Sequence, residues 1–131
     1  MTATEVAGLA VLPSLAGAAL AFVLGGAWYA VLGAPAPDSE APPRAVGLTA
    51  LVEVLRCLLL ATVVAVLAAL TGAEAWWLGA LLGLALFVGF PLVLWTGANW
   101  HERTPWRTAA IHAGDWLGKL VAVGALVGAL L

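Results

Sequence analysis

The sequence has few charged residues and a single cysteine, and both shortages exclude whole classes of protein. Only 9% of its 131 residues are Asp, Glu, Lys or Arg, whereas 64% are hydrophobic. Soluble domains have about 25% charged residues, so this chain has too little polar surface to cover a soluble domain of its length. The lone Cys57 excludes an intrachain disulfide and is expected to pack as a small apolar side chain. We therefore predict an integral membrane protein in contact with the lipid bilayer.

Basic clusters and catalytic motifs are also lacking. The five Lys and Arg residues are scattered singly along the chain, so nucleic-acid binding has no electrostatic basis. There is no H-E-x-x-H and no Gly-rich loop that joins a strand to a helix, and Ser14 and Ser39 have no base near them in sequence. We expect no cofactor, and an enzymatic activity is the less favoured hypothesis.

Long apolar segments make up most of what is present. Four of them are long enough to cross a bilayer as helices, and we predict spans over residues 6–29, 46–70, 75–97 and 106–131. The first span follows Glu5 with no Lys or Arg before it, which favours a retained span over a signal peptide. The fold predicted is an all-α, up-down bundle of four transmembrane helices in a single domain.

Several local signals mark the ends and interruptions of these spans. Residues 33–45 contain four of the seven prolines, which excludes both a helix and the bilayer core. Residues 71–74 form a short turn that suits neighbouring antiparallel helices. Gly89 and Pro91 predict a kink within the third span. Aromatic residues near span ends are typical of the membrane interface, and they include Trp28, Tyr29 and Trp95.

The positive charges in the loops predict the orientation. Four spans place the first and third loops on one side of the membrane, and these loops contain Arg44, Arg103 and Arg107. Short cytoplasmic loops are enriched in Lys and Arg. We therefore expect both termini outside.

Ionisable residues within two spans form the candidate site. Glu53 and Arg56 lie in span two; His112, Asp115 and Lys119 share one helical face of span four, because they are three and four residues apart. At 1.5 Å per residue, the two carboxylates and the two cations lie roughly 10 to 18 Å deep. A single charge at that depth costs at least about 2.5 kcal/mol. We expect Asp115 to pair with Arg56 and Lys119 with Glu53, although both spacings also allow pairing within one helix.

Two hypotheses for this charged layer stay open. In the first, the ion pairs only fix helix packing in a structural or partner-binding membrane subunit. In the second, the layer is a relay or binding site for a proton, an ion or a small polar solute, because a carboxylate beside a histidine can change charge near physiological pH. No metal site is expected, since His112 and Asp115 are too few ligands and Lys119 would repel a divalent cation.

Two further features accompany the layer. Trp116 borders the polar face, as a core residue or as a hydrophobic gate over the charged layer. Gly79 and Gly83 in span three, and Gly114 and Gly118 in span four, have the four-residue spacing typical of close helix packing. The span-four pair can serve a helix of the same chain or a second subunit of a homo-oligomer.

Four segments of the chain resemble a known family. They are AFVLGGAWY in span one, LVEVLR in span two, GFPLVLWTG in span three and TPWRTAAIHAGDWLGKL leading into span four. They look like the bacterial membrane proteins catalogued as domain of unknown function 1761, and the resemblance covers nearly the whole chain, from Ala21 to Lys119. The resemblance implies a four-helix bacterial membrane protein, expected in the inner membrane, and it supplies no activity.

Overall fold

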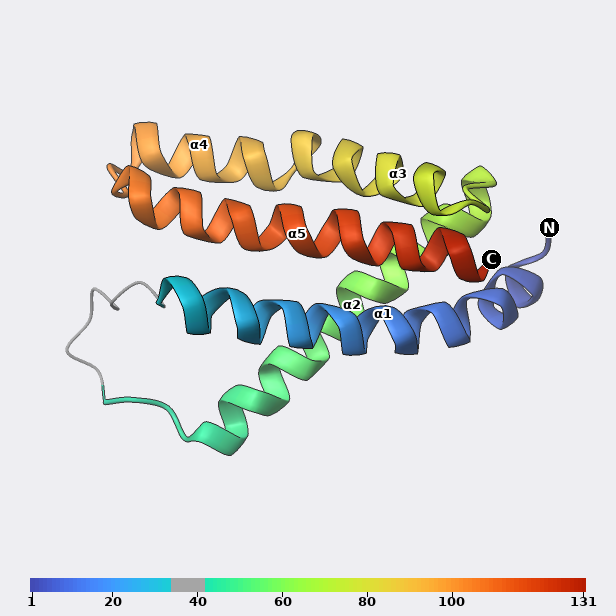
Figure 1. Ribbon diagram of the computed structural model, residues 1–131, viewed down its shortest axis with the longest axis horizontal. Helices are drawn as coiled ribbons and strands as arrows, with labels where there is room; N and C mark the ends of the chain where they lie inside the picture. The colour runs from blue at the N-terminus through green and yellow to red at the C-terminus, as the bar shows by residue number, and fades with distance from the viewer. Residues whose placement is uncertain (34–41) are drawn as a thin grey trace.

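The computed structural model describes residues 1–33 and 42–131 and is all-α over these ranges. The helices are α1 (Ala3–Leu32), α2 (Val46–Thr71), α3 (Trp76–Gly89), α4 (Pro91–His101) and α5 (Trp106–Leu130) (Figure 1). Since α3 and α4 form one apolar segment, four segments within the described ranges are long and apolar enough to cross a membrane. The predicted all-α membrane bundle is confirmed. Most of the proline-rich connection predicted over 33–45 lies outside the described residues.

A capping box begins α1. The Thr2 hydroxyl accepts a hydrogen bond from the Glu5 backbone N–H at 3.2 Å, and the Glu5 carboxylate accepts one from the Thr2 N–H at 2.6 Å. Both amides would otherwise lack a partner in the first turn. Glu5 therefore has a local structural role at the start of the helix.

The third apolar segment is broken at Phe90, whose backbone angles are φ −126° and ψ −75°. Pro91 has no N–H, so the carbonyl of Phe87, four residues earlier, cannot receive its helical hydrogen bond. The helix stops at Gly89 and restarts at Pro91. The kink predicted at this position is present.

Helix α5 occupies the centre of the bundle. It packs against α1 on one side and against α3 and α4 on the other, while α2 crosses α1 obliquely (Figure 1). All six buried residues of α2 lie at or after Cys57. The first turns of α2 therefore diverge from the other helices, and this divergence determines where the molecule is open.

Glycines bring α3 and α5 into backbone contact. A Cβ atom on Gly79 would overlap the carbonyl group of Gly124, and one on Gly83 would overlap that of Leu120. Only hydrogen fits at these two positions of α3. Close approach of this kind increases the dispersion contacts that hold helices together in a bilayer.

The span-four glycines are placed differently. A Cβ on Gly114 would collide with the Trp28 indole, whose Nε1 donates a hydrogen bond to the Ile111 carbonyl at 2.8 Å. A Cβ on Gly118 would have nothing within 4 Å among the described residues. Of the two alternatives for Gly118, packing against a helix of the same chain is therefore wrong for the described residues, and packing against a second subunit stays a prediction. The close contact with α3 uses Gly124, which is six residues later and on a different face of the helix.

Candidate functional site

The divergence of α2 leaves a cavity of about 840 Å³ bordered by α1, α2, α4 and α5. A cavity needs only about 10 to 15 Å³ to hold one water molecule. This one has room for a small solute together with water. All five residues predicted from the sequence as the charged layer line this cavity: Glu53, Arg56, His112, Asp115 and Lys119. Arg44, which precedes α2, lines it as well.

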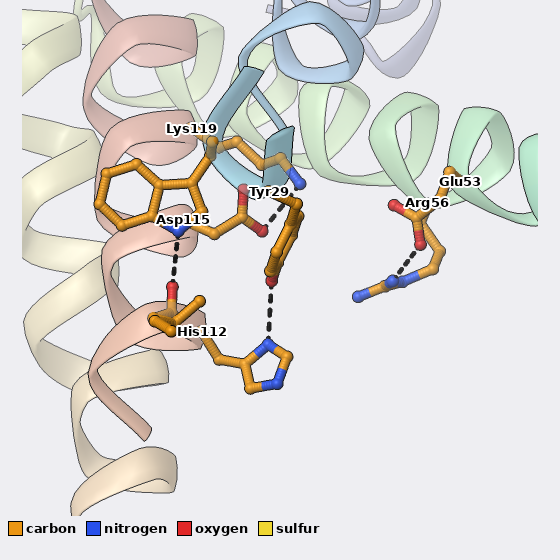
Figure 2. Close-up of polar contacts among 8 residues, drawn as sticks. Tyr29, Glu53, Arg56, His112, Asp115 and Lys119 are labelled. Atoms are coloured by element: carbon orange, nitrogen blue, oxygen red, sulfur yellow. Dashed lines mark hydrogen bonds and ion pairs between the residues drawn. The ribbon is translucent and has the colours of Figure 1, made fainter. Parts of the chain in front are cut away.

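Both ion pairs lie within single helices. Lys119 Nζ donates to Asp115 Oδ2 at 2.9 Å on α5. Arg56 donates to Glu53 on α2, and Figure 2 shows this pair set apart from the α5 residues. The predicted pairing of Asp115 with Arg56, and of Lys119 with Glu53, is therefore wrong. The start of α2 diverges from α5, so each charge finds its nearest partner one turn away on its own helix.

The two pairs differ strongly in burial. The side chains of Asp115 and Lys119 are each 9% exposed, whereas those of Arg56 and Glu53 are 57% and 36% exposed. Removing one member of a buried pair leaves an uncompensated charge in a low-dielectric environment. The α5 pair, which is the more enclosed by protein, is therefore expected to matter more for stability than the α2 pair.

Gly25 of α1 makes room for the α5 pair. A Cβ on Gly25 would lie 2.8 Å from both Cε and Nζ of Lys119, closer than real Cβ contacts. The lysine side chain therefore crosses the surface of α1 at a position where that helix has no side chain. Sequence reasoning missed this role of Gly25, although the adjacent glycines 25 and 26 were a signal that another group approaches α1 closely.

Two buried polar atoms that belong to cavity-lining residues have no hydrogen-bond partner within the described part of the chain. They are Asp115 Oδ1, an acceptor, and Trp95 Nε1, a donor. A buried polar atom left unpaired costs about 1 to 3 kcal/mol. Both atoms are closed off from solvent in this conformation, so a molecule in the cavity reaches them only if the surrounding side chains move.

Aromatic residues hold His112 at the cavity wall. Its Nδ1 atom shares a hydrogen bond with the Tyr29 hydroxyl at 2.9 Å (Figure 2). The Trp95 ring stacks on the imidazole with centroids 4.6 Å apart and planes 16° apart. Tyr29 and Trp95, which the sequence pattern assigns to the membrane interface, thus belong to the site. Among residues 1–33 and 42–131, no three His, Cys, Asp or Glu side chains gather as a metal site would require.

Trp116 borders two spaces. It is half-buried and lines the polar cavity, and it also lines an apolar groove of about 650 Å³ between α2 and the α3–α4 break. Its role as a hydrophobic gate stays a prediction.

Comparison with known proteins identifies a family. The family model described as "Protein of unknown function (DUF1761)" matches residues 12–128. No curated protein and no solved structure matches the chain. The matched range contains every residue that the sequence suggested for the charged layer.

Proposed function

The chain belongs to the DUF1761 family, and from this premise we propose that it is a small transport protein that binds a proton or a small polar solute in the cavity. The family is one of unknown function, so the proposal rests on the residues of this chain. It is a multi-pass membrane protein, because four helical segments are long and apolar enough to span a bilayer. The observation that carries the proposal is the buried Asp115–Lys119 pair at the cavity wall, with Asp115 Oδ1 unpaired among residues 1–33 and 42–131.

The position of the ionisable groups supports a binding role. Charged side chains at membrane depth are costly and are typically found along substrate or ion pathways. Here they line a space large enough for water and solute instead of a closed core. Asp115 places a titratable carboxylate, 9% exposed, at the wall of this space.

The location of the ion pairs argues against the structural hypothesis. Ion pairs that fix the packing of two helices must join those helices. The Glu53–Arg56 pair lies within α2 and the Asp115–Lys119 pair within α5. Neither pair links α2 to α5, so the pairs do not fix the packing of these two helices, and Lys119 contacts α1 only where Gly25 leaves room for it.

A flux measurement with the double variant Asp115→Asn/Lys119→Met tests the proposal. Removing both charges together leaves no unpaired charge, so the fold should persist while the titratable group is lost. Liposomes containing the parent protein should show proton flux with a pH-sensitive dye, or glycerol flux by light scattering, above that of protein-free liposomes. The double variant should lose this flux.

The control variant is Glu74→Gln, which makes the same carboxylate-to-amide change at an exposed position between α2 and α3. It should retain the parental rate. Parental flux in the folded double variant would contradict the proposal, and so would a parent that never exceeds the protein-free baseline in either assay.

We also propose that the protein lies in a bacterial inner membrane with both termini outside. Cysteines placed at Glu102 and at Glu74, in a Cys57→Ala background, test this, because the two exposed sites lie at opposite ends of the α3–α4 segment. In intact cells, an impermeant maleimide should label the cysteine at 74 and spare the one at 102. The reverse pattern would invert the orientation.

A further inference from the structure

The free oxygen of Asp115 is closed to solute molecules in this conformation. Asp115 Oδ2 accepts a hydrogen bond from Lys119 Nζ at 2.9 Å, whereas Oδ1 has no hydrogen-bond partner among residues 1–33 and 42–131 and less than 1 Å² of accessible surface. A solute or a hydrated cation in the cavity therefore does not touch Oδ1. A proton can reach such an atom by passing along hydrogen-bonding side chains, as in the Asp, Glu and His relays of membrane pumps.

Helix α1 lies directly against this oxygen. A Cβ on Gly25 would be 3.6 Å from Asp115 Oδ1, and Tyr29 is one turn further along the same face of α1. The Tyr29 hydroxyl interacts with the Asp115 carboxylate, although Oδ1 is left without a hydrogen bond. Figure 2 shows the Tyr29 ring beside that carboxylate, with its hydroxyl directed at His112. The hydroxyl thus lies between two titratable groups of α5.

His112 connects the hydroxyl to the cavity. Its Nδ1 atom shares the 2.9 Å hydrogen bond with Tyr29, and its other ring nitrogen points away from Tyr29 (Figure 2). The imidazole is half-buried, lines the cavity and is stacked on the indole of Trp95. An imidazole can take up a proton at one nitrogen and release another from the second. His112 is therefore placed to exchange protons between water in the cavity and Tyr29.

The other ionisable groups around the cavity belong to α2, to the residue before it and to α5. In the cavity lining, α1 contributes only Tyr29 as a titratable group, and α4 contributes Trp95 but no ionisable side chain. The remaining ionisable lining residues are Arg44, Glu53, Arg56, Cys57 and Lys119. Each carboxylate pairs with a cation of its own helix. The path from the cavity to Asp115 Oδ1 therefore runs through His112 and Tyr29.

We infer that the species transported is the proton, and that the Tyr29 hydroxyl relays it between His112 and Asp115. This inference rests on the proposed function of the cavity and names its substrate. With His112 protonated at Nδ1, Nε2 binds a proton from hydronium in the cavity, Nδ1 passes its proton to the Tyr29 oxygen, and the Tyr29 hydroxyl passes its own to Asp115 Oδ1. Histidine and tyrosine end the step neutral, so only the charge of Asp115 changes. The last transfer requires a side-chain movement that brings the hydroxyl and Oδ1 within hydrogen-bond distance.

Proton flux into liposomes containing Tyr29→Phe tests the relay. This change removes the hydroxyl and keeps the ring, and it should lower the proton flux by about a hundredfold, as expected for loss of a positioned proton-transfer group. Trp28→Phe is the matched control, because the Trp28 indole makes a hydrogen bond of similar length between the same two helices, to the Ile111 carbonyl at 2.8 Å, and does not line the cavity. It should keep the parental flux. Thermal unfolding in detergent shows whether each variant has folded.

Fluorination of Tyr29 tests the relay without removing the hydroxyl. Tyr29 is the only tyrosine in the chain, so biosynthetic incorporation of fluorotyrosine changes this side chain alone. The fluorinated phenol ionises at lower pH, and an ionised phenol has no proton to pass on. The decline of proton flux at high pH should therefore move to lower pH. A hydroxyl that only orients His112 would leave the pH profile unchanged, and that result would overturn the relay.

The outcomes separate this inference from the proposed function. Proton flux that persists in folded Tyr29→Phe but is lost in Asp115→Asn/Lys119→Met would overturn the relay alone, and so would a parent that conducts glycerol but not protons. An equal loss of flux in folded Trp28→Phe would also overturn it, because contact between α1 and α5 would then matter instead of the hydroxyl. A parent without flux above the protein-free baseline in either assay would overturn both.

Discussion

Replacing Lys119 with methionine is expected to destabilise the protein by about 3 to 5 kcal/mol, because breaking one side of a buried ion pair leaves the other charge uncompensated. The charge left behind is Asp115, whose side chain is 9% exposed and whose partner lies 2.9 Å away. Few single substitutions in this chain should cost as much. Thermal unfolding in detergent, followed by circular dichroism, measures the loss.

A double-mutant cycle shows whether the loss comes from the pair itself. Adding Asp115→Asn to Lys119→Met should recover much of the stability, because no buried charge then remains. Arg56→Met is the control, since it breaks the pair that is less enclosed by protein and should cost less than Lys119→Met. Additive losses at Asp115 and Lys119, or an equal loss at Arg56, would show that the α5 pair is not the stabilising contact.

Gly83→Leu is expected to separate α3 from α5. Even a Cβ at this position would overlap the backbone carbonyl of Leu120, and backbone cannot rotate away as a flexible side chain can. Overpacking typically costs about 1 to 3 kcal/mol. We expect the upper part of that range or more, with a lower unfolding temperature and a loss of monodispersity on gel filtration.

Gly118→Leu is the matched control, because it makes the same change in the middle of α5 where a Cβ has nothing within 4 Å among the described residues. Its unfolding temperature should stay close to that of the parent. Equal destabilisation by the two substitutions would show that the α3–α5 contact is not specific. A stable Gly83→Leu protein would exclude the close approach itself.

Several features of the fold follow from the sequence because they depend on chemistry that is local in the chain. Apolar segments of about 20 residues must form helices in a bilayer, where every backbone polar group needs a partner within the segment. The break at Pro91 follows from the missing N–H of proline. Glu53 and Asp115 both line the cavity. This agrees with their similar predicted depths, which were obtained by counting residues inward from the same end of the two spans.

The sequence by itself determined which residues are ionisable, which helix carries each one, and which neighbours one turn away can pair with them, because the helical repeat sets distances along a single helix. Only the tertiary structure decided that Lys119 pairs with Asp115 instead of Glu53, that Tyr29 and Trp95 contact His112, and that Gly124 rather than Gly118 meets α3. These outcomes depend on the inclination of α2 and on the rotation of α5 about its axis. Both are set by the sum of many packing contacts between residues far apart in the chain, and no periodicity within one segment specifies that sum.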